Sequence, residues 1–178
     1  MVLRQHNLLW WIALGMIWCL SCVLDHTWLH LDQGLPSWDQ AEYLSSAIEH
    51  GRQLGLLSPG RWEGVEPLLD LSPKIPPLSS IISGSLMSVV GQTPDQAGWI
   101  LSLWHGVLLL TVASWGRCIG GRRLGLLAAL LLAMAPGMAE HRVEFKLDLP
   151  LTGATTLALF LLYRWQRPGR IGGRWPQA

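Results

Sequence analysis

The sequence predicts an all-α integral membrane protein, with four transmembrane helices and a large outer loop that carries amphipathic juxtamembrane helices. Half of the 178 residues (50%) are hydrophobic and only 14% are charged. The mean hydropathy is +0.31. The apolar residues also gather into long runs, such as 8–24 and 124–139, and do not spread evenly as they would around one soluble core.

Four apolar segments are predicted to span the membrane, each slightly shorter than the ~20 residues of a standard transmembrane helix. They are residues 8–24, 98–116, 124–139 and 149–165. No small-residue cleavage site follows the first segment, so we interpret it as an uncleaved span and not as a signal peptide. A fifth stretch, Pro77–Val90, is shorter and contains five serines.

The positions of the charges predict the side of the membrane on which each loop lies. If Pro77–Val90 does not cross, Arg4 and the arginines at 117–123 and 164–174 all lie on one side, which the positive-inside rule makes cytoplasmic. Every Asp and Glu then lies outside, in 25–97 or 140–148. We therefore interpret Pro77–Val90 as an interfacial or re-entrant part of the outer loop 25–97.

This topology predicts a protein of the inner or plasma membrane with both termini in the cytoplasm. Residues 166–178 are rich in Gly, Pro and Arg, and we expect them to form a disordered cytoplasmic tail. The four predicted spans contain no charged residue away from their ends, which argues against a transporter.

Asp39 belongs to a predicted surface helix early in the outer loop. Ser37 is a favourable N-cap, and Gln40 follows three residues later, as in a capping box. Apolar residues recur at helical spacing at Trp38, Ala41, Leu44 and Ile48. The pattern predicts a short amphipathic helix on the membrane surface, followed by a loop over 51–64. Asp39 falls in the first turn of this helix, where it is either a candidate site residue or a charge in contact with water that the helix dipole favours.

Lys74 precedes the Pro76–Pro77 pair at the start of the short apolar stretch. We expect its ammonium group at headgroup level, where it either pairs with a phosphate or remains an ordinary snorkelling lysine.

Residues 140–148 place three acids, two cations and one histidine in one short predicted outer loop. Arg142 and Lys146 are four residues apart, so on a helix they would share a face and hold a phosphate, or pair with Glu144 and Asp148. A divalent metal ion is a candidate ligand here, with His141 and Glu140 among the donors. The sequence contains no P-loop, GxSxG or HExxH motif, and we expect no nucleic-acid partner.

Four features follow one another along the chain: a first span, an outer loop that opens with W-D-x-A-x-Y-L, a later K-x-P-P-L, and an outer D-L-P-L at the start of a span. Together they resemble the GT-C membrane glycosyltransferases. The nearest likeness is to dolichyl-phosphate-mannose protein mannosyltransferases and aminoarabinose-lipid A transferases, over residues 7–165. The resemblance implies active-site roles for Asp39 and Asp148 and a phosphate contact for Lys74. Family members are much longer, so 1–165 is expected to be the N-terminal part of such a transmembrane module, in a fragment or truncated form.

The expected function is transfer of a sugar from a polyprenyl-phosphate donor to a lipid, glycan or protein acceptor on the outer face. Asp39 would act as the base and Asp148 would assist, while Lys74, Arg142 and Lys146 would contact the donor phosphate. Membrane lipids are further partners, and a divalent metal is the one candidate cofactor. The alternative is a non-catalytic membrane remnant or a scaffold subunit.

Overall fold

The structure is a computed structural model that describes residues 2–56, 65–71 and 77–166. These residues are 89% helical and contain no strand, so the predicted all-α class is confirmed for them. Their helices are α1 (Val2–Leu31), α2 (Trp38–Leu56), α3 (Val65–Asp70), α4 (Pro77–Val90), α5 (Pro94–Met134), α6 (Pro136–Val143) and α7 (Asp148–Trp165). Lys74 and the tail from 167 onward lie outside the described residues.

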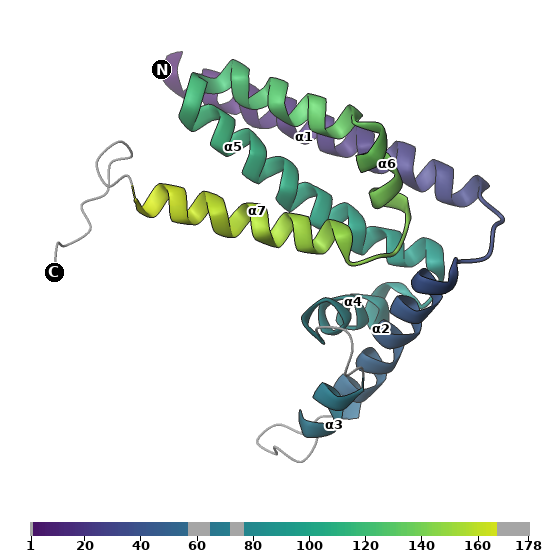
Figure 1. Cartoon of the computed structure of the whole chain (residues 1–178). Coiled ribbons are helices and arrows are strands. Elements are labelled where there is room, and N and C mark those ends of the chain that lie inside the picture. The colour runs from purple at the N-terminus through teal and green to yellow at the C-terminus, as the bar shows by residue number, and fades with distance from the viewer. Residues whose placement is uncertain (1, 57–64, 72–76, 167–178) are drawn as a thin grey trace, which may run out of the picture.

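The long helices α1, α5 and α7 form a bundle, and α2, α3 and α4 gather at one of its ends (Figure 1). Two helices are long and apolar enough to cross a membrane, α1 over Leu8–Leu31 and α5. The pair of α6 and α7, bent by 114°, counts as a third if it forms one span. Together with many exposed leucines on these helices, this indicates an integral membrane protein.

Helix α5 is interrupted at Gly120 and Gly121, whose backbone angles are not helical. Gly121 has φ of 83°, a conformation that favours glycine. The chain reverses there, and the second half of α5 returns beside α1 (Figure 1). Gly116 and Gly125 lie at the crossing of the two halves, since a Cβ on Gly116 would lie 2.9 Å from Cα of Gly125. The predicted spans 98–116 and 124–139 begin in the two halves of this one interrupted helix.

Two apolar clusters hold the bundle together. One joins α1 to both halves of α5 through Trp10, Ala113 and Ala129. The other includes Leu44 of α2 and Met87 of α4, and it lies where these helices meet α5, Phe145 and Leu149. Burial of this second cluster fixes the position of α2 against the start of α7.

Helix α2 begins at Trp38, directly after Ser37, as the capping pattern predicts. It continues to Leu56, so the prediction of a loop from residue 51 is wrong at its start. The extension packs on α4, because Gly51 lets the two backbones approach: a Cβ there would lie 2.7 Å from the carbonyl oxygen of Gly84. The hydroxyl of Ser46 also donates to Ser80 Oγ at 3.2 Å across the same contact.

Substitution of Gly51 tests this close contact. We expect Gly51→Ala to destabilise the protein by about 1–3 kcal/mol, because the new methyl group meets backbone that cannot move aside. Gly55→Ala is the matched control on the same helix, where a Cβ has no neighbour within 4 Å. That change should leave stability unchanged or raise it by up to about 1 kcal/mol. Thermal unfolding in detergent micelles, followed by circular dichroism, measures both; equal effects would contradict the packing.

Candidate functional site

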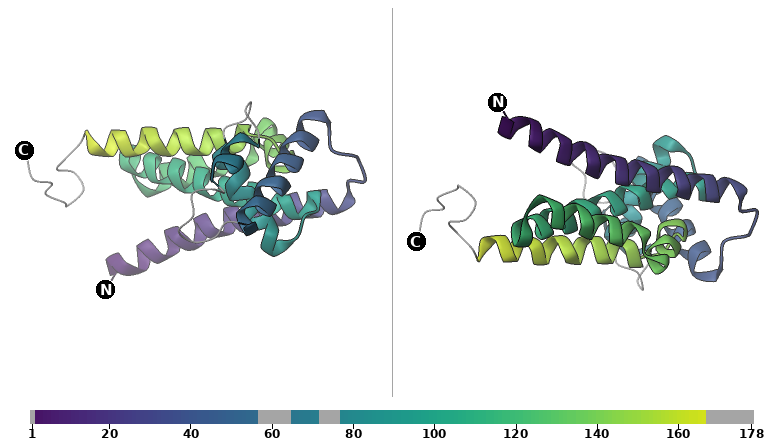
Figure 2. Two further views of the ribbon diagram at one scale, coloured as in Figure 1. Left: turned by 90° about the horizontal axis from the view of Figure 1, so that it is seen from below. Right: turned by 90° about the horizontal axis from the view of Figure 1, so that it is seen from above.

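The helix ends divide into two groups. The N-terminal end of α1, the interruption of α5 and the C-terminal end of α7 lie at one end of the bundle (Figures 1 and 2). Arg117, Arg122 and Arg123 flank the interruption, and Arg164 lies in the last turn of α7. Helices α2 and α4 and the connection from α6 to α7 lie at the other end (Figure 1). These elements and α6 carry the predicted site residues that the structure describes, which are Asp39, Glu140, His141, Arg142, Lys146 and Asp148.

A buried ion pair joins α1 to α6 at this end. Arg142 donates from Nε to Asp25 Oδ2 at 2.8 Å and from Nη2 to Asp25 Oδ1 at 3.0 Å. Its Nη1 donates to the carbonyl oxygen of Ala133 at 2.7 Å. Asp25 and Arg142 are 5% and 6% exposed. A bidentate pair of this kind is strong and directional, and it fixes α6 against α1 and the end of α5.

Asp25 was not among the predicted site residues. It directly follows the predicted first span, but α1 continues to Leu31, so Asp25 lies within the candidate span Leu8–Leu31. The candidate span of α1 therefore contains an internal charge, unlike the shorter predicted span 8–24. The predicted phosphate role of Arg142 stays a prediction, and in this structure Asp25 already neutralises the guanidinium group.

Lys146 lies in the connection between α6 and α7, where its ammonium group donates to Glu144 Oε2. This hydrogen bond is the main cause of a raised pKa for Lys146. Desolvation opposes it as the next largest effect, and the charges of Glu144, Glu140 and, least of all, Asp39 raise the pKa further. Lys146 is therefore held as a cation. Asp39, in the first turn of α2, therefore lies within electrostatic range of Lys146.

The two predicted catalytic aspartates are both exposed to solvent. Asp39 is in the first turn of α2, and Asp148 is in the first turn of α7, two residues after Lys146. Each carboxylate thus sits at a helix N-terminus, where the helix dipole stabilises negative charge. Their exposure leaves both free to meet a substrate.

A cleft of about 260 Å³ opens at this end of the bundle, between the end of α1, the segment 32–37, α2, the start of α5 and residues 143–145. Ser37 and Gln40 line it, on either side of Asp39, but Asp39 itself does not. The other lining residues are Trp28, Leu29, Asp32, Gly34, Leu35, Pro36, Leu44, Pro94, Asp95, Val143, Glu144 and Phe145.

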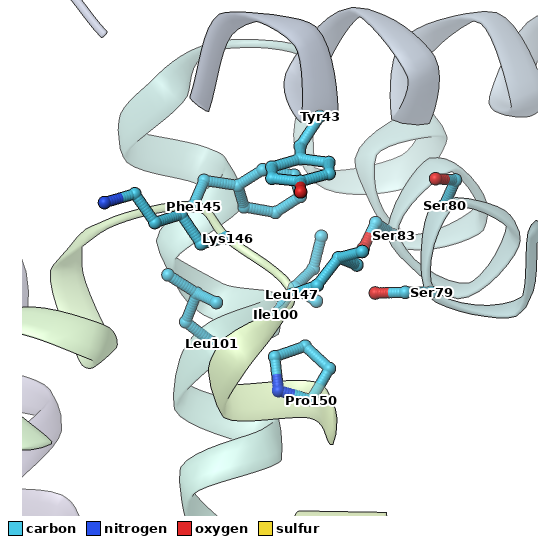
Figure 3. A pocket seen from close by; sticks show the side chains of 10 residues that line it. All are labelled: Tyr43, Ser79, Ser80, Ser83, Ile100, Leu101, Phe145, Lys146, Leu147 and Pro150. Carbon is cyan, nitrogen blue, oxygen red and sulfur yellow. The ribbon is translucent and has the colours of Figure 1, made fainter. Parts of the chain in front are cut away.

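A second pocket lies between α2, α4, α5 and the start of α7, with a volume of about 10 Å³ (Figure 3). Tyr43 and the α4 serines Ser79, Ser80 and Ser83 form its polar side, and the Lys146 ammonium group points away from them (Figure 3). A space of this size holds about one water molecule. It is therefore a packing defect and not a substrate site.

The metal hypothesis receives no support from the part of the chain that is described. Within it, no group of three or more His, Cys, Asp or Glu side chains could hold a metal ion, including around Glu140 and His141. Nδ1 of His141 is buried without a hydrogen-bond partner. We assign no metal to the site.

Comparison with known proteins returns no relative. No family model, no curated protein and no solved structure matches the chain. The GT-C resemblance therefore stays a prediction that rests on the sequence motifs.

Removal of one partner of the buried ion pair tests its importance. We expect Asp25→Leu and Arg142→Met each to destabilise the protein by about 3–5 kcal/mol, because each leaves an uncompensated buried charge. The double variant should lose much less than the sum of the two, since no charge is left without a partner. Arg52→Met, on an exposed position of α2, controls for loss of a cation. Denaturation in mixed micelles measures the cycle, and additive losses would rule out the pairing.

Proposed function

We propose that this chain is a glycosyltransferase module of the GT-C kind, which moves a sugar from a polyprenyl-phosphate donor to an acceptor on the outer face of the membrane. The observation that carries the proposal is the packing of Leu44 of α2 against Phe145 and Leu149, which places Asp39 close enough to Lys146 to affect its pKa. It joins two segments that the motifs assign to one active site, although more than a hundred residues separate them. The cleft beside them has the size of a small ligand.

The topology that we propose has four crossings, by α1, the two halves of α5, and α7. The clustering of Arg117, Arg122, Arg123 and Arg164 at the end where α1 begins supports this arrangement, because basic residues favour the cytoplasmic side. Residues 122–134 are shorter than one helix needs to cross the ~30 Å hydrocarbon layer, and after the break at Ala135 the chain turns into α6 (Figure 1). Helices α2, α3 and α4 then lie outside.

An outer location explains the choice of donor. Nucleotide sugars are cytoplasmic, so a transferase that works outside needs a sugar carried by a lipid. In the reaction, the Asp39 carboxylate takes the proton of an acceptor hydroxyl or amine, whose freed electron pair attacks the anomeric carbon. The bond from that carbon to the phosphate oxygen breaks, and polyprenyl phosphate leaves with the electron pair. Asp148 orients the acceptor.

Lys146 is suited to the leaving group. It is a cation held by Glu144 Oε2, and it would exchange this partner for the departing phosphate, whose developing negative charge a cation stabilises. Lys74 would contribute in the same way, on the strength of its motif alone. Arg142 supports the site indirectly, through its ion pair with Asp25.

Replacement of Asp39 tests the proposed base. Membranes that carry the protein are supplied with a polyprenyl-phosphate sugar, and transfer to acceptor is measured. We expect Asp39→Asn to lower the rate by about 10²- to 10⁴-fold, because the amide cannot accept the proton. Glu42→Gln, an exposed acid one turn further along α2, should leave the rate unchanged. Full transfer by Asp39→Asn would exclude Asp39 as the base, and no transfer by the unaltered chain would favour the scaffold alternative.

A further inference from the structure

We infer that one end of the bundle binds the phosphate headgroups of anionic phospholipids. This end consists of the start of α1, the interruption of α5 and the last turn of α7 (Figures 1 and 2). We call it the arginine end, after Arg117, Arg122, Arg123 and Arg164. The inference does not rest on the proposed reaction, because Asp39, Lys146 and Asp148 belong to the opposite end (Figure 1).

The charge of the arginine end has a single sign. Arg123 and Arg164 are exposed. Arg117 and Arg122, on either side of the α5 interruption, are partly buried. No Asp or Glu occurs in the three stretches of sequence that meet here, which are residues 2–24, 98–139 and 149–166. Because an arginine side chain is effectively always charged, this end carries a permanent positive field, which attracts anionic headgroups.

Aromatic rings support two of these arginines. Arg117 Cζ lies 5.0 Å from the centroid of the Trp10 ring of α1, and Trp10 Nε1 donates to the carbonyl oxygen of Arg122 at 3.3 Å. Arg164 Cζ lies 5.8 Å from the centroid of the Phe160 ring. A guanidinium group over an aromatic ring is attracted to the ring face, and its N–H donors remain along its own planar edge. Such an edge binds two oxygens of a phosphate at once.

The rings at this end form an aromatic layer that is typical of a membrane–water interface. Trp115 of α5 packs against Phe160 and Tyr163 of α7, with ring centroids 6.0 and 5.6 Å apart. Trp11 near the start of α1 and Trp165 at the end of α7 are both exposed. Tryptophan and tyrosine gather at headgroup depth, because their rings have an apolar body and a polar edge. The aromatic layer therefore places the arginines where they meet lipid phosphates.

A phospholipid fits this surface better than a soluble anion does. Ile119, close to the interruption of α5, is 67% exposed, and Trp165, directly after Arg164, is 76% exposed. Apolar surface beside the charges is stabilised only by an apolar partner. A soluble phosphate would leave these side chains in water, whereas one lipid supplies both a phosphate and acyl chains.

Spin-labelled lipids test the inference without any transfer reaction. The full chain is reconstituted in phosphatidylcholine bilayers that contain a trace of spin-labelled phosphatidylglycerol or spin-labelled phosphatidylcholine. Electron paramagnetic resonance measures the fraction of each label that the protein immobilises, and the ratio of the two association constants is the preference for the anionic lipid. We expect a preference of about fivefold or more, because one arginine near an anionic headgroup contributes about a fivefold gain in affinity.

Variants of single arginines locate the binding, and circular dichroism checks that each stays folded. Arg123→Gln and Arg164→Gln should each lower the preference by about two- to fivefold. Arg52→Gln, on an exposed position of α2 at the opposite end, is the matched control and should leave the preference unchanged. Glycerol phosphate, added at constant ionic strength, should not displace the lipid, because it has no acyl chains. No preference in the unaltered chain, equal losses in all three variants, no loss in either arginine-end variant, or full displacement by glycerol phosphate would each overturn the inference.

Discussion

The ion pair between Asp25 and Arg142 is the interaction on which the rest of this end of the molecule depends. Two charges that are each less than one-tenth exposed stabilise one another only in good geometry, and here the guanidinium makes two bonds to the carboxylate and one to the Ala133 carbonyl. Arg142 is thereby held on α1, and the chain that follows it packs on α2, where Phe145 joins the same apolar cluster as Leu44. That path delivers Glu144, Phe145 and Lys146 to the cleft and its rim.

Close backbone contacts complete the arrangement. Gly51 and Gly84 allow α2 to lie directly on α4, and Gly116 and Gly125 allow the halves of α5 to fold on one another. Association of helices in lipid gains little from the hydrophobic effect, so where the two halves of α5 cross, small residues carry much of the specificity. The ion pair and the glycine contacts act together, since one places residues 143–147 and the other places α2 opposite them.

Local features of this fold could be predicted from the sequence, whereas contacts between residues far apart in the chain could not. The apolar runs predicted the helical class, and Ser37 predicted where α2 begins. The pairing of Lys146 with Glu144 was one of two alternatives, since these residues are neighbours. The ion-pair partner of Arg142 could not be predicted, because Asp25 lies 117 positions away and the sequence pattern places it just outside the first span. The cleft could not be predicted either, since three stretches that are far apart in the chain form it, residues 28–44, 94–95 and 143–145. The four-span arrangement and the catalytic roles stay predictions.

The central claim is that α2, the cleft and residues 144–147 lie on the outer side of the membrane, opposite the interruption of α5. Reporter fusions after Val90 and after Gly121 measure this most directly, with alkaline phosphatase active only outside and green fluorescent protein fluorescent only in the cytoplasm. The account predicts phosphatase activity after Val90 and fluorescence after Gly121. Fluorescence after Val90 would contradict it, because α2 and its Asp39 would then face the cytoplasm, where no lipid-carried donor is needed.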